Sequence, residues 1–366
     1  MKIINRDYLS KLINGTNTSD IKVVCGVLGA GKSVLLASFL EYILENKKNN
    51  NVIYINLSLK EFSKLTDSSL LKDYVLDKYK EGKDNYLLLD EIQLCNDYLS
   101  VIKELKDKSK YNIFLSCSEK ITLDDSLGPI NYINVYPFSF KEYNQFCNFQ
   151  HLDESFDRYI LEGGLSGIYE TIDEDLKTNY IGNIYTSILK KVSDPNNMDL
   201  LDNINKYLMG DMTVLASLGK DAASLPSYIE QFCNNFLYYK ISPYNSQGQD
   251  MYFCVDHSFR NYLLDVKNYS FDDLYKNIVC IELLRRGYTV YYRDVDFIVV
   301  NNKGNIKFLV QVSNDVIEDK FSKLAENKDK VPKVYIARTN KESYNQDGVQ
   351  VVDIARWLDI DNDYLI

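Results

Sequence analysis

A glycine-rich segment of eight residues limits what this chain can fold into: Gly26-Val27-Leu28-Gly29-Ala30-Gly31-Lys32-Ser33. It satisfies the pattern G-x-x-x-x-G-K-[ST] and lies between an apolar strand-like segment, 21–25, and a helix-like segment, 32–46. Glycines let successive backbone N–H groups face one point, and the following helix adds its positive end. The sequence therefore predicts a phosphate-binding loop, in which Lys32 reaches the β and γ phosphates of a nucleotide and the Ser33 hydroxyl coordinates Mg²⁺. The alternative is a chance glycine-rich turn.

A second segment, Tyr86-Leu-Leu-Leu-Asp-Glu91, is predicted to form a buried strand with two carboxylates at its end. We expect it one strand away from the first in the same sheet, so that Asp90 joins the Mg²⁺ shell and Glu91 polarises the attacking water. Two polar residues that end other strands are further candidates. Ser116 could orient water near the γ phosphate or simply bond its own turn, and Asn56 could contact Glu91.

Strand-like and helix-like segments alternate over residues 1–145, which predicts an α/β fold with a doubly wound parallel sheet. The expected strands are 21–25, 51–56, 86–90, 113–117 and 130–136, with helices at 32–46 and 70–79. From 139 to about 212 the pattern is helical, with breaks at Gly163-Gly164 and at 193–197. Then follow a helix at 227–240, a strand at 251–255, a helix at 271–286 that Gly287 ends, and strands at 289–292, 297–300, 307–312 and 333–336.

The composition narrows the classes of function. A net charge of −10 and a pI of about 4.9 are weak grounds for nucleic-acid binding, although they leave room for a local basic face. The seven cysteines are scattered and lack any CxxC spacing, so we interpret them as reduced core residues rather than a disulfide framework or a zinc site. No signal-peptide core or membrane-length apolar run is present in the sequence. We therefore expect a cytoplasmic protein with no membrane partner.

Several motifs together resemble one family. They are the glycine-rich segment, 52–56 (VIYIN), 87–93 (LLLDEIQ), 136–143 (YPFSFKEY), 159–167 (YILEGGLSG), Ile184-Tyr185, 277–288 (NIVCIELLRRGY) and 294–297 (DVDF). Over nearly its whole length the chain resembles the prokaryotic AAA+-like P-loop ATPases that carry a C-terminal DUF4143 region. The resemblance implies a RecA/AAA+-type core that uses ATP and Mg²⁺ at 1–145. It also implies a helical lid with a reduced winged-helix-like segment at 146–262, and a domain related to PD-(D/E)XK nucleases at 263–366.

The chain departs from the family pattern at the basic residues. Leu28-Gly29 stand where the family usually has basic residues, and Gly128-Pro129 stand where it often has Gly-Arg, a candidate arginine finger. No arginine lies between Ala30 and Arg158. Because an arginine finger contributes ~10³–10⁵ in rate, we expect slow turnover unless another arginine, such as Arg158, substitutes.

The nuclease-like domain also lacks part of the pattern that cleavage needs. Glu282 and Asp296 match the helix acid and the strand-start acid, but Gln311-Val312-Ser313 replaces E-x-K. Gln is a weaker Mg²⁺ ligand than a carboxylate, and Ser313 cannot supply the charge of a lysine. The resemblance therefore implies a domain that does not cleave. The helix expected at 227–240 has Lys240 as its strong base, which favours packing over DNA recognition.

Three functions remain open from the sequence. The leading hypothesis is an ATPase whose nucleotide state moves the C-terminal regions, with Gly163-Gly164 as a hinge or merely a helix break. The second is a nucleotide switch or adaptor that holds ATP or ADP with little turnover. The third is a DNA-processing protein in which Arg285, Arg286 and Arg293 contact phosphates, although a solvated helix end explains the first two as well. A homo-oligomer or an unknown protein partner is compatible with each.

Overall fold

The computed structural model describes residues 6–192, 197–211, 214, 218, 224–264, 270–301 and 303–360. The chain divides into two compact units, of which the first ends at Val135 and the second begins at Tyr136. The helix break predicted at 193–197 lies almost wholly outside the described residues. The end of the helical stretch near 212 lies outside them as well.

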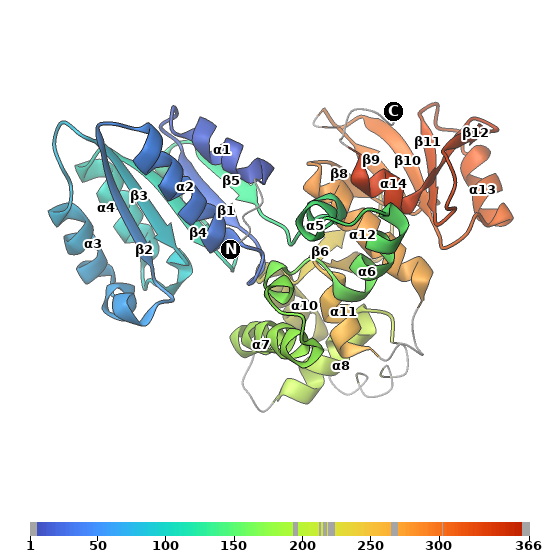
Figure 1. The fold of residues 1–366 in the computed structure, drawn as a ribbon, viewed down its shortest axis with the longest axis horizontal. Helices are drawn as coiled ribbons and strands as arrows, with labels where there is room; N and C mark the ends of the chain where they lie inside the picture. Colours follow the sequence, from blue (N-terminus) through green and yellow to red (C-terminus); the bar gives the residue numbers. More distant parts are fainter. Residues whose placement is uncertain are drawn as a thin grey trace. The chain divides into compact units, whose positions relative to one another are not determined.

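The first unit is a parallel sheet with helices on both faces (Figure 1). Its described strands are β1 (Ile21–Cys25), β2 (Asn50–Asn56), β3 (Asp84–Asp90), β4 (Tyr111–Cys117) and β5 (Ile130–Asn134), and they lie in the order β2-β3-β4-β1-β5. All neighbouring strands are parallel. The predicted α/β parallel sheet is therefore confirmed, and each strand expected in it is present.

The direction of each crossover between strands determines the face of the sheet on which the helices of the first unit lie. They are α1 (Asp7–Gly15), α2 (Lys32–Asn46), α3 (Ser68–Asp77) and α4 (Tyr98–Lys108), with short 3₁₀ turns η1 (Lys60–Thr66), η2 (Ile92–Leu94) and η3 (Asp125–Leu127). The connection from β1 to β2 crosses the sheet in one direction, and those from β2 to β3 and from β3 to β4 cross it in the other. Because such crossovers are right-handed, α2 and α4 lie on opposite faces, as Figure 1 shows.

Burial on both faces explains the apolar strands of the first unit. Every residue of β1 is buried, and so are Leu87, Leu88 and Leu89 in the middle of β3. Side-chain caps set the helix ends: α3 begins at Asp67, whose carboxylate accepts from the N–H groups of Ser69 and Leu70 at 3.0 and 3.1 Å. Helices α1 and α4 were not expected from the sequence.

The second unit opens with helices and a hairpin. The described helices are α5 (Phe140–Cys147), α6 (Leu152–Glu162), α7 (Glu174–Val192), α8 (Met198–Leu208), α10 (Leu225–Asn234) and α11 (His257–Leu263), with the turn η4 (Ser166–Glu170). Helix α5 begins at a capping box in which the side chains of Ser139 and Glu142 satisfy each other's backbone N–H groups. Strands β6 (Tyr238–Ile241) and β7 (Met251–Cys254) pair antiparallel.

The helix predicted at 227–240 is wrong beyond Asn234. Helix α10 ends there because Phe236 has a left-handed backbone, with φ of 57°, and β6 begins two residues later. Lys240 therefore lies on a strand, where its ammonium group is 3.2 Å from a carboxylate oxygen of Asp250. Lys240, which we expected on this helix, is therefore not on a helix.

A mixed sheet forms the rest of the second unit. Its described strands are β8 (Thr289–Tyr291), β9 (Phe297–Val300), β10 (Ile306–Val312), β11 (Lys333–Ala337), β12 (Tyr344–Gln346) and β13 (Val349–Asp353), in the order β12-β13-β11-β10-β9-β8. Helices α12 (Phe271–Arg285), α13 (Glu318–Ala325) and α14 (Ile354–Asp359) pack against it. The helix expected at 271–286 and the four strands expected after it are present, whereas β12, β13, α13 and α14 were not expected.

Candidate functional site

The glycine-rich segment connects β1 to α2 and is fixed at its first residue. The Gly26 N–H donates to the carbonyl oxygen of Cys117 on β4 at 3.3 Å. A Cβ atom on residue 26 would lie 2.0 Å from the carbonyl oxygen of Val135, so that side chains larger than hydrogen are excluded there. Gly29 and Gly31 have φ of 85° and 89°, a left-handed backbone that other residues rarely adopt. The glycines of the motif are thus required by the geometry of the turn.

Lys32 lies inside this loop. Its side chain is 3% exposed, and its ammonium group donates to the carbonyl oxygens of Gly26 at 3.0 Å and Val27 at 3.1 Å. The same nitrogen is 3.5 Å from Oε1 of Glu91. Ser33 follows in the first turn of α2, where the positive end of the helix dipole favours anions. The loop therefore gathers a buried cation, a hydroxyl and a helix N-terminus.

Asp90 ends β3 and is fully buried. Its carboxylate accepts hydrogen bonds from the Asn56 amide at 2.9 Å, from the Tyr54 hydroxyl at 3.1 Å and from the Ser116 hydroxyl. Burial, together with the nearby Asp90 carboxylate, raises the pKa of Tyr54 to about 12. Asn56 was expected to contact Glu91, but its side chain bonds to Asp90 instead.

Glu91 has an unusual backbone for a residue other than glycine. Its φ and ψ are 58° and 50°, a left-handed conformation that costs about 1–3 kcal/mol and is found mostly at functional sites. Its backbone N–H donates to Ser116 Oγ at 3.0 Å. Its carboxylate Oε2 accepts from the Ser118 hydroxyl at 2.6 Å and from the Gln93 amide at 2.5 Å. The strained residue is thus held at both its backbone and its side chain.

The serines at the end of β4 make contacts that differ from those we expected. Ser116 bonds neither its own turn nor the Glu91 carboxylate; its hydroxyl bridges Asp90 and the Glu91 N–H. Ser118, two residues further along, contacts the Glu91 carboxylate, as does Gln93 in η2. Gln93 could have been found from its place two positions after Glu91, whereas the contact of Ser118 depends on the order of the strands.

The two motifs are separated by one strand of the sheet. β4 lies between β1 and β3, and the register pairs Cys25 with Cys117 and Leu89 with Leu115. The carboxyl ends of all three strands therefore meet at one edge, which is where ligands bind in open α/β sheets. The intervening strand supplies the serines that hold the two acids, so the expected proximity of the motifs depends on it.

Arg6 is a further residue at this edge that sequence reasoning did not find. Its guanidinium donates to the carbonyl oxygen of Ala30 in the loop at 2.9 Å, and lies 4.8 Å above the ring of Tyr8. The sequence has no other arginine before Arg158. A lone arginine just upstream of a phosphate-binding motif is the sequence feature that could have identified Arg6. Arg158 itself lies on α6, with its guanidinium 5.5 Å from the centre of the Phe149 ring.

Two buried cysteines lie beside the loop. Cys25 and Cys117 are register partners on β1 and β4, and all seven cysteines are unbridged. The neighbouring Cys117 thiol lowers the pKa of Cys25, with the Lys32 ammonium acting in the same direction, while the Cys25 thiol and burial raise the pKa of Cys117. In the parts of the chain that the structure describes, no cluster of three or more His, Cys, Asp or Glu side chains is placed to hold a metal.

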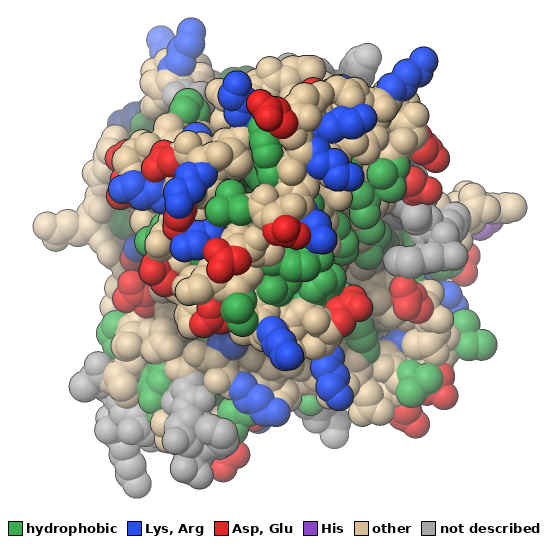
Figure 2. Space-filling model, turned by 90° about the vertical axis from the view of Figure 1, so that its left-hand side faces the viewer, with side chains coloured by type: hydrophobic (Ala, Val, Ile, Leu, Met, Phe, Trp, Pro, Cys, Tyr) green, Lys and Arg blue, Asp and Glu red, His purple; other side chains and the backbone are tan. Residues whose placement is uncertain are grey.

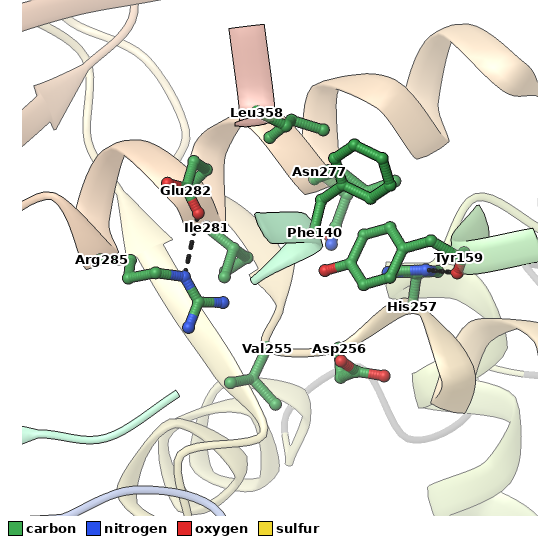
Figure 3. A pocket seen from close by; sticks show the side chains of 11 residues that line it. Phe140, Tyr159, Val255, Asp256, His257, Asn277, Ile281, Glu282, Arg285 and Leu358 are labelled. Carbon is green, nitrogen blue, oxygen red and sulfur yellow. Dashed lines mark hydrogen bonds and ion pairs between the residues drawn. The ribbon is translucent and has the colours of Figure 1, made fainter. Parts of the chain in front are cut away.

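The candidate acids of the C-terminal region are bound by the protein's own cations and amides. Figure 3 shows Glu282 beside Arg285 on α12; its two oxygens accept from Nε of Arg285 at 2.9 Å and of Arg286 at 2.8 Å. Asp296 is 2.9 Å from the ammonium of Lys276 and also accepts from the Gln311 amide. Each of these acids is therefore ion-paired with basic side chains of the protein itself.

The remaining candidates of this region are similarly engaged. The Ser313 hydroxyl lies 2.6 Å from that of Tyr335, and Arg293 pairs with Asp294 and Asp329, each at 2.7 Å. Figure 2 looks onto another surface, the side of the first unit that carries α3 and β2, and there basic and acidic side chains are interspersed. Neither observation provides a uniformly basic surface for a phosphate backbone.

Gly163-Gly164 is part of a buried polar junction in the second unit. The Gly164 N–H donates to Asp256 at 2.8 Å, and its carbonyl oxygen accepts from the Phe138 N–H at 2.7 Å. Figure 3 shows Asp256 next to His257, whose ring nitrogen lies 2.7 Å from the carbonyl oxygen of Tyr159. Side chains at either glycine would collide with Asp256. These contacts favour the interpretation of the pair as a fixed helix break.

The order of the parallel strands, the loop after β1 and the acids at the end of β3 together define a P-loop nucleotide-binding domain. Comparison with known proteins agrees: residues 18–144 match the AAA_14 family, described as an AAA domain. This match covers β1 to β5 and supports ATP binding by the first unit.

Relatives exist over both the whole chain and a part of it. An uncharacterized protein of Haemophilus influenzae is 27% identical over 396 aligned positions, which span 97% of this chain and 98% of that protein. The uncharacterized protein MJ1637 of Methanocaldococcus jannaschii is 25% identical over 48% of this chain and 39% of its own length. Among solved structures, a Walker-type ATPase of Pyrococcus abyssi has a TM-score of 0.46 at 15% identity, covering 71% of this chain and 96% of that one.

Of the helices described, none has the length and apolar character needed to cross a bilayer.

Proposed function

We propose that this protein is a Mg²⁺-dependent ATPase. Lys32 contacts the β and γ phosphates, with the backbone of residues 26–31 around them, and Glu91 polarises the attacking water. The observation that supports this assignment is the 3.5 Å separation between the Lys32 ammonium and the Glu91 carboxylate. A group that binds the γ phosphate and a group that can take a proton from water are therefore neighbours.

The residues at this edge of the sheet fit a magnesium ion. Ser33 and Asp90 would hold it, and the ion would neutralise charge on the phosphates. A carboxylate has about four acceptor positions, and Asp90 uses three of them for Tyr54, Asn56 and Ser116. One position is left over, through which Asp90 would interact with Mg²⁺.

Phosphate release by the purified full-length chain tests the proposal. We expect Mg²⁺-dependent release that Glu91→Gln lowers about 10²–10⁴-fold, while the dissociation constant of ATP changes little. Glu61→Gln is the matched control, because Glu61 is an exposed acid of the same unit. Release that is equal in Glu91→Gln and the wild type, or that persists in excess EDTA, would refute the assignment.

The second candidate function is a nucleotide switch or adaptor that retains ATP with little turnover. The observation favouring it is the lack of any arginine from residue 7 to residue 157, since an arginine finger contributes ~10³–10⁵ in rate. Tight ATP retention without phosphate release would identify the switch. Specific activity that rises with protein concentration would instead indicate that an assembled homo-oligomer supplies the missing cation.

We propose in addition that the C-terminal region, 263–366, resembles PD-(D/E)XK nucleases without cleaving DNA. The support is the ion pair of Asp296 with Lys276, whose ammonium occupies the place beside the carboxylate that a metal cation would take, while Gln311 and the Val312 N–H bind its other oxygen. Mg²⁺-dependent cleavage that Asp296→Ala abolishes would contradict this view. Retention of DNA at low salt would keep a DNA-binding role.

The finer organisation belongs to the same proposal. We assign residues 146–262 to a helical lid with a reduced winged-helix-like segment, represented by α10 and the β6–β7 hairpin. Nucleotide state would be coupled to movement of this region and of the C-terminal one, in a cytoplasmic protein. Protection of backbone amides from hydrogen exchange in 146–366, measured with and without ATP, tests that coupling.

A further inference from the structure

Gln93 lies in η2, the turn that begins directly after the strained residue Glu91. Its amide nitrogen donates to Glu91 Oε2 at 2.5 Å and to Ser118 Oγ at 3.1 Å. The Ser118 hydroxyl in turn donates to the same Glu91 oxygen at 2.6 Å. Glu91, Gln93 and Ser118 therefore form a closed triangle of hydrogen bonds at the end of β3 and β4.

The triangle fixes the assignment of the Gln93 amide. A carboxylate oxygen only accepts, so the Gln93 atom that faces Glu91 must be the NH₂ group. The amide oxygen, Oε1, is then directed elsewhere. It is buried, and no donor among the described residues reaches it. A buried acceptor of this kind needs a donor from a ligand or from water.

The left-handed backbone of Glu91 is what brings the two side chains together. With φ of 58°, the chain turns sharply after β3, and both Glu91 and Gln93 reach Ser118 at the end of β4. The Glu91 N–H is tied to Ser116 in the same turn. Such a conformation persists only where the surrounding contacts over-determine it, and here those contacts converge on the side chain that we propose as the base.

We propose that Gln93 is a catalytic residue that orients the attacking water of ATP hydrolysis; the inference deepens the function proposed above and rests on it. The water donates one hydrogen bond to Gln93 Oε1 and passes its other proton to the Glu91 carboxylate. Its oxygen forms the new bond to the γ phosphorus while the bond between that phosphorus and the β–γ bridging oxygen breaks. The electron pair of the broken bond stays on ADP, and the proton leaves Glu91 with the phosphate or to solvent.

The single amide of glutamine has a donor end and an acceptor end, which explains why this residue suits the position. The NH₂ group and Ser118 hold the base, and the amide oxygen accepts from the water, so that water and base are held at a fixed separation. Leucine or methionine at residue 93 would fill the same space and supply neither contact. Glutamate would keep an acceptor but place a second carboxylate against Glu91, which repels it.

Comparison of Gln93→Met with Ser118→Ala separates a catalytic Gln93 from one that only braces Glu91. Both variants remove one donor to Glu91 Oε2, but Gln93→Met alone removes the acceptor for water. We expect Gln93→Met to lower kcat on the order of 100-fold and Ser118→Ala within about tenfold, with the dissociation constant of ATP nearly unchanged in both. Equal losses in the two variants would show a bracing role and overturn the proposal.

Binding of phosphate analogues gives a second readout that does not depend on turnover. MgADP with aluminium fluoride mimics the γ phosphate in line with its attacking water, whereas MgADP with beryllium fluoride mimics bound ATP. We expect Gln93→Met to weaken the aluminium fluoride complex about 100-fold and to leave the beryllium fluoride complex unchanged. Equal effects on both complexes would refute the role of Gln93.

The inference and the proposed function fail in different ways. A wild-type chain that binds ATP but releases no phosphate above Glu91→Gln would overturn the ATPase assignment and Gln93 with it. A wild-type chain that hydrolyses ATP, together with a Gln93→Met variant of normal kcat, would leave the ATPase standing and remove Gln93 alone.

Discussion

The guanidinium of Arg6 donates a hydrogen bond of 2.9 Å to the carbonyl oxygen of Ala30, between the two left-handed glycines of the phosphate-binding loop. Arg6 precedes α1, and its guanidinium also lies over the ring of Tyr8, which is 6% exposed. A charged donor thus connects the start of the described chain to the loop. Since the contact is to the backbone of Ala30, it acts on the shape of the loop itself.

Arg6→Gln should weaken nucleotide binding. Hydrogen bonds from charged donors contribute about 1.5–3 kcal/mol, so we expect the dissociation constants of ATP and ADP to rise about tenfold or more. The matched control is Lys11→Ala, because Lys11 is an exposed cation that also lies over Tyr8, at 5.5 Å. Titration with a fluorescent ADP analogue measures both. Equal affinities for wild type and Arg6→Gln would show that the contact does not matter for binding.

Gly26→Ala should destabilise the first unit and abolish nucleotide binding. The added Cβ would lie 2.0 Å from the Val135 carbonyl oxygen, and overpacking of this kind costs about 1–3 kcal/mol or more. Gly82→Ala is the control, because residue 82 has φ of 77° but open space around it. Its cost should be limited to left-handed strain of about 1–2 kcal/mol, with normal nucleotide affinity. Thermal unfolding and nucleotide titration distinguish the two, and similar behaviour of both variants would contradict the steric argument.

The second unit should lose stability in mild acid through His257. Burial lowers the pKa of His257 below its ordinary 6.5, although the Asp256 carboxylate opposes the shift. Below about pH 6.5 the unfolded chain therefore binds a proton that the folded chain does not. The contribution of uncharged His257 to the free energy of unfolding is therefore complete above that pH. It falls as pH decreases, by at most about 1.4 kcal/mol per pH unit.

Replacing His257 should flatten this acid dependence. We expect His257→Gln to reduce the change in the free energy of unfolding between pH 7 and pH 5, measured by urea denaturation. His151→Gln is the control, because His151 is exposed. An unchanged pH dependence in His257→Gln would show that other groups cause the acid sensitivity.

Glu282→Gln should destabilise the second unit without affecting ATP turnover. Glu282 is 7% exposed, and its two oxygens accept from Arg285 and Arg286. Glutamine would keep one acceptor, but it would remove the negative charge and turn an NH₂ donor toward the other guanidinium. Breaking a buried pair costs about 3–5 kcal/mol. Glu326→Gln, at an exposed position, should change stability little. Chemical denaturation measures the free energy of unfolding of both variants. An unchanged free energy in Glu282→Gln would show that the Glu282 carboxylate does not stabilise the fold.

The sequence specified the first unit well because each of its signals is local. Continuous apolar runs such as Ile21–Cys25 and Leu87–Leu89 report strands buried on both faces, and the glycine pattern reports a turn that needs left-handed residues. These signals do not depend on distant partners. Asp90 and Glu91 could be placed at the edge of the sheet for the same reason.

Partners within the site could not be predicted, because they depend on strand order. Nothing in the local sequence says that β4 inserts between β1 and β3, so Ser118 could not be connected with Glu91, nor Asn56 with Asp90. The left-handed Phe236 shows the opposite difficulty. Its apolar neighbours read as a continuing helix, while the pairing of β6 with β7 overrides that propensity.

The distribution of buried cysteines gives each unit its own reporter of unfolding. Cys25, Cys95 and Cys117 are buried in the first unit, and Cys254 and Cys280 in the second, whereas Cys147 and Cys233 are half-buried. A thiol reagent should therefore react first at the last two in the native protein. Labelling at the other positions, resolved by peptide mass as denaturant is added, would show whether the two units open together or one before the other, with no engineered probe.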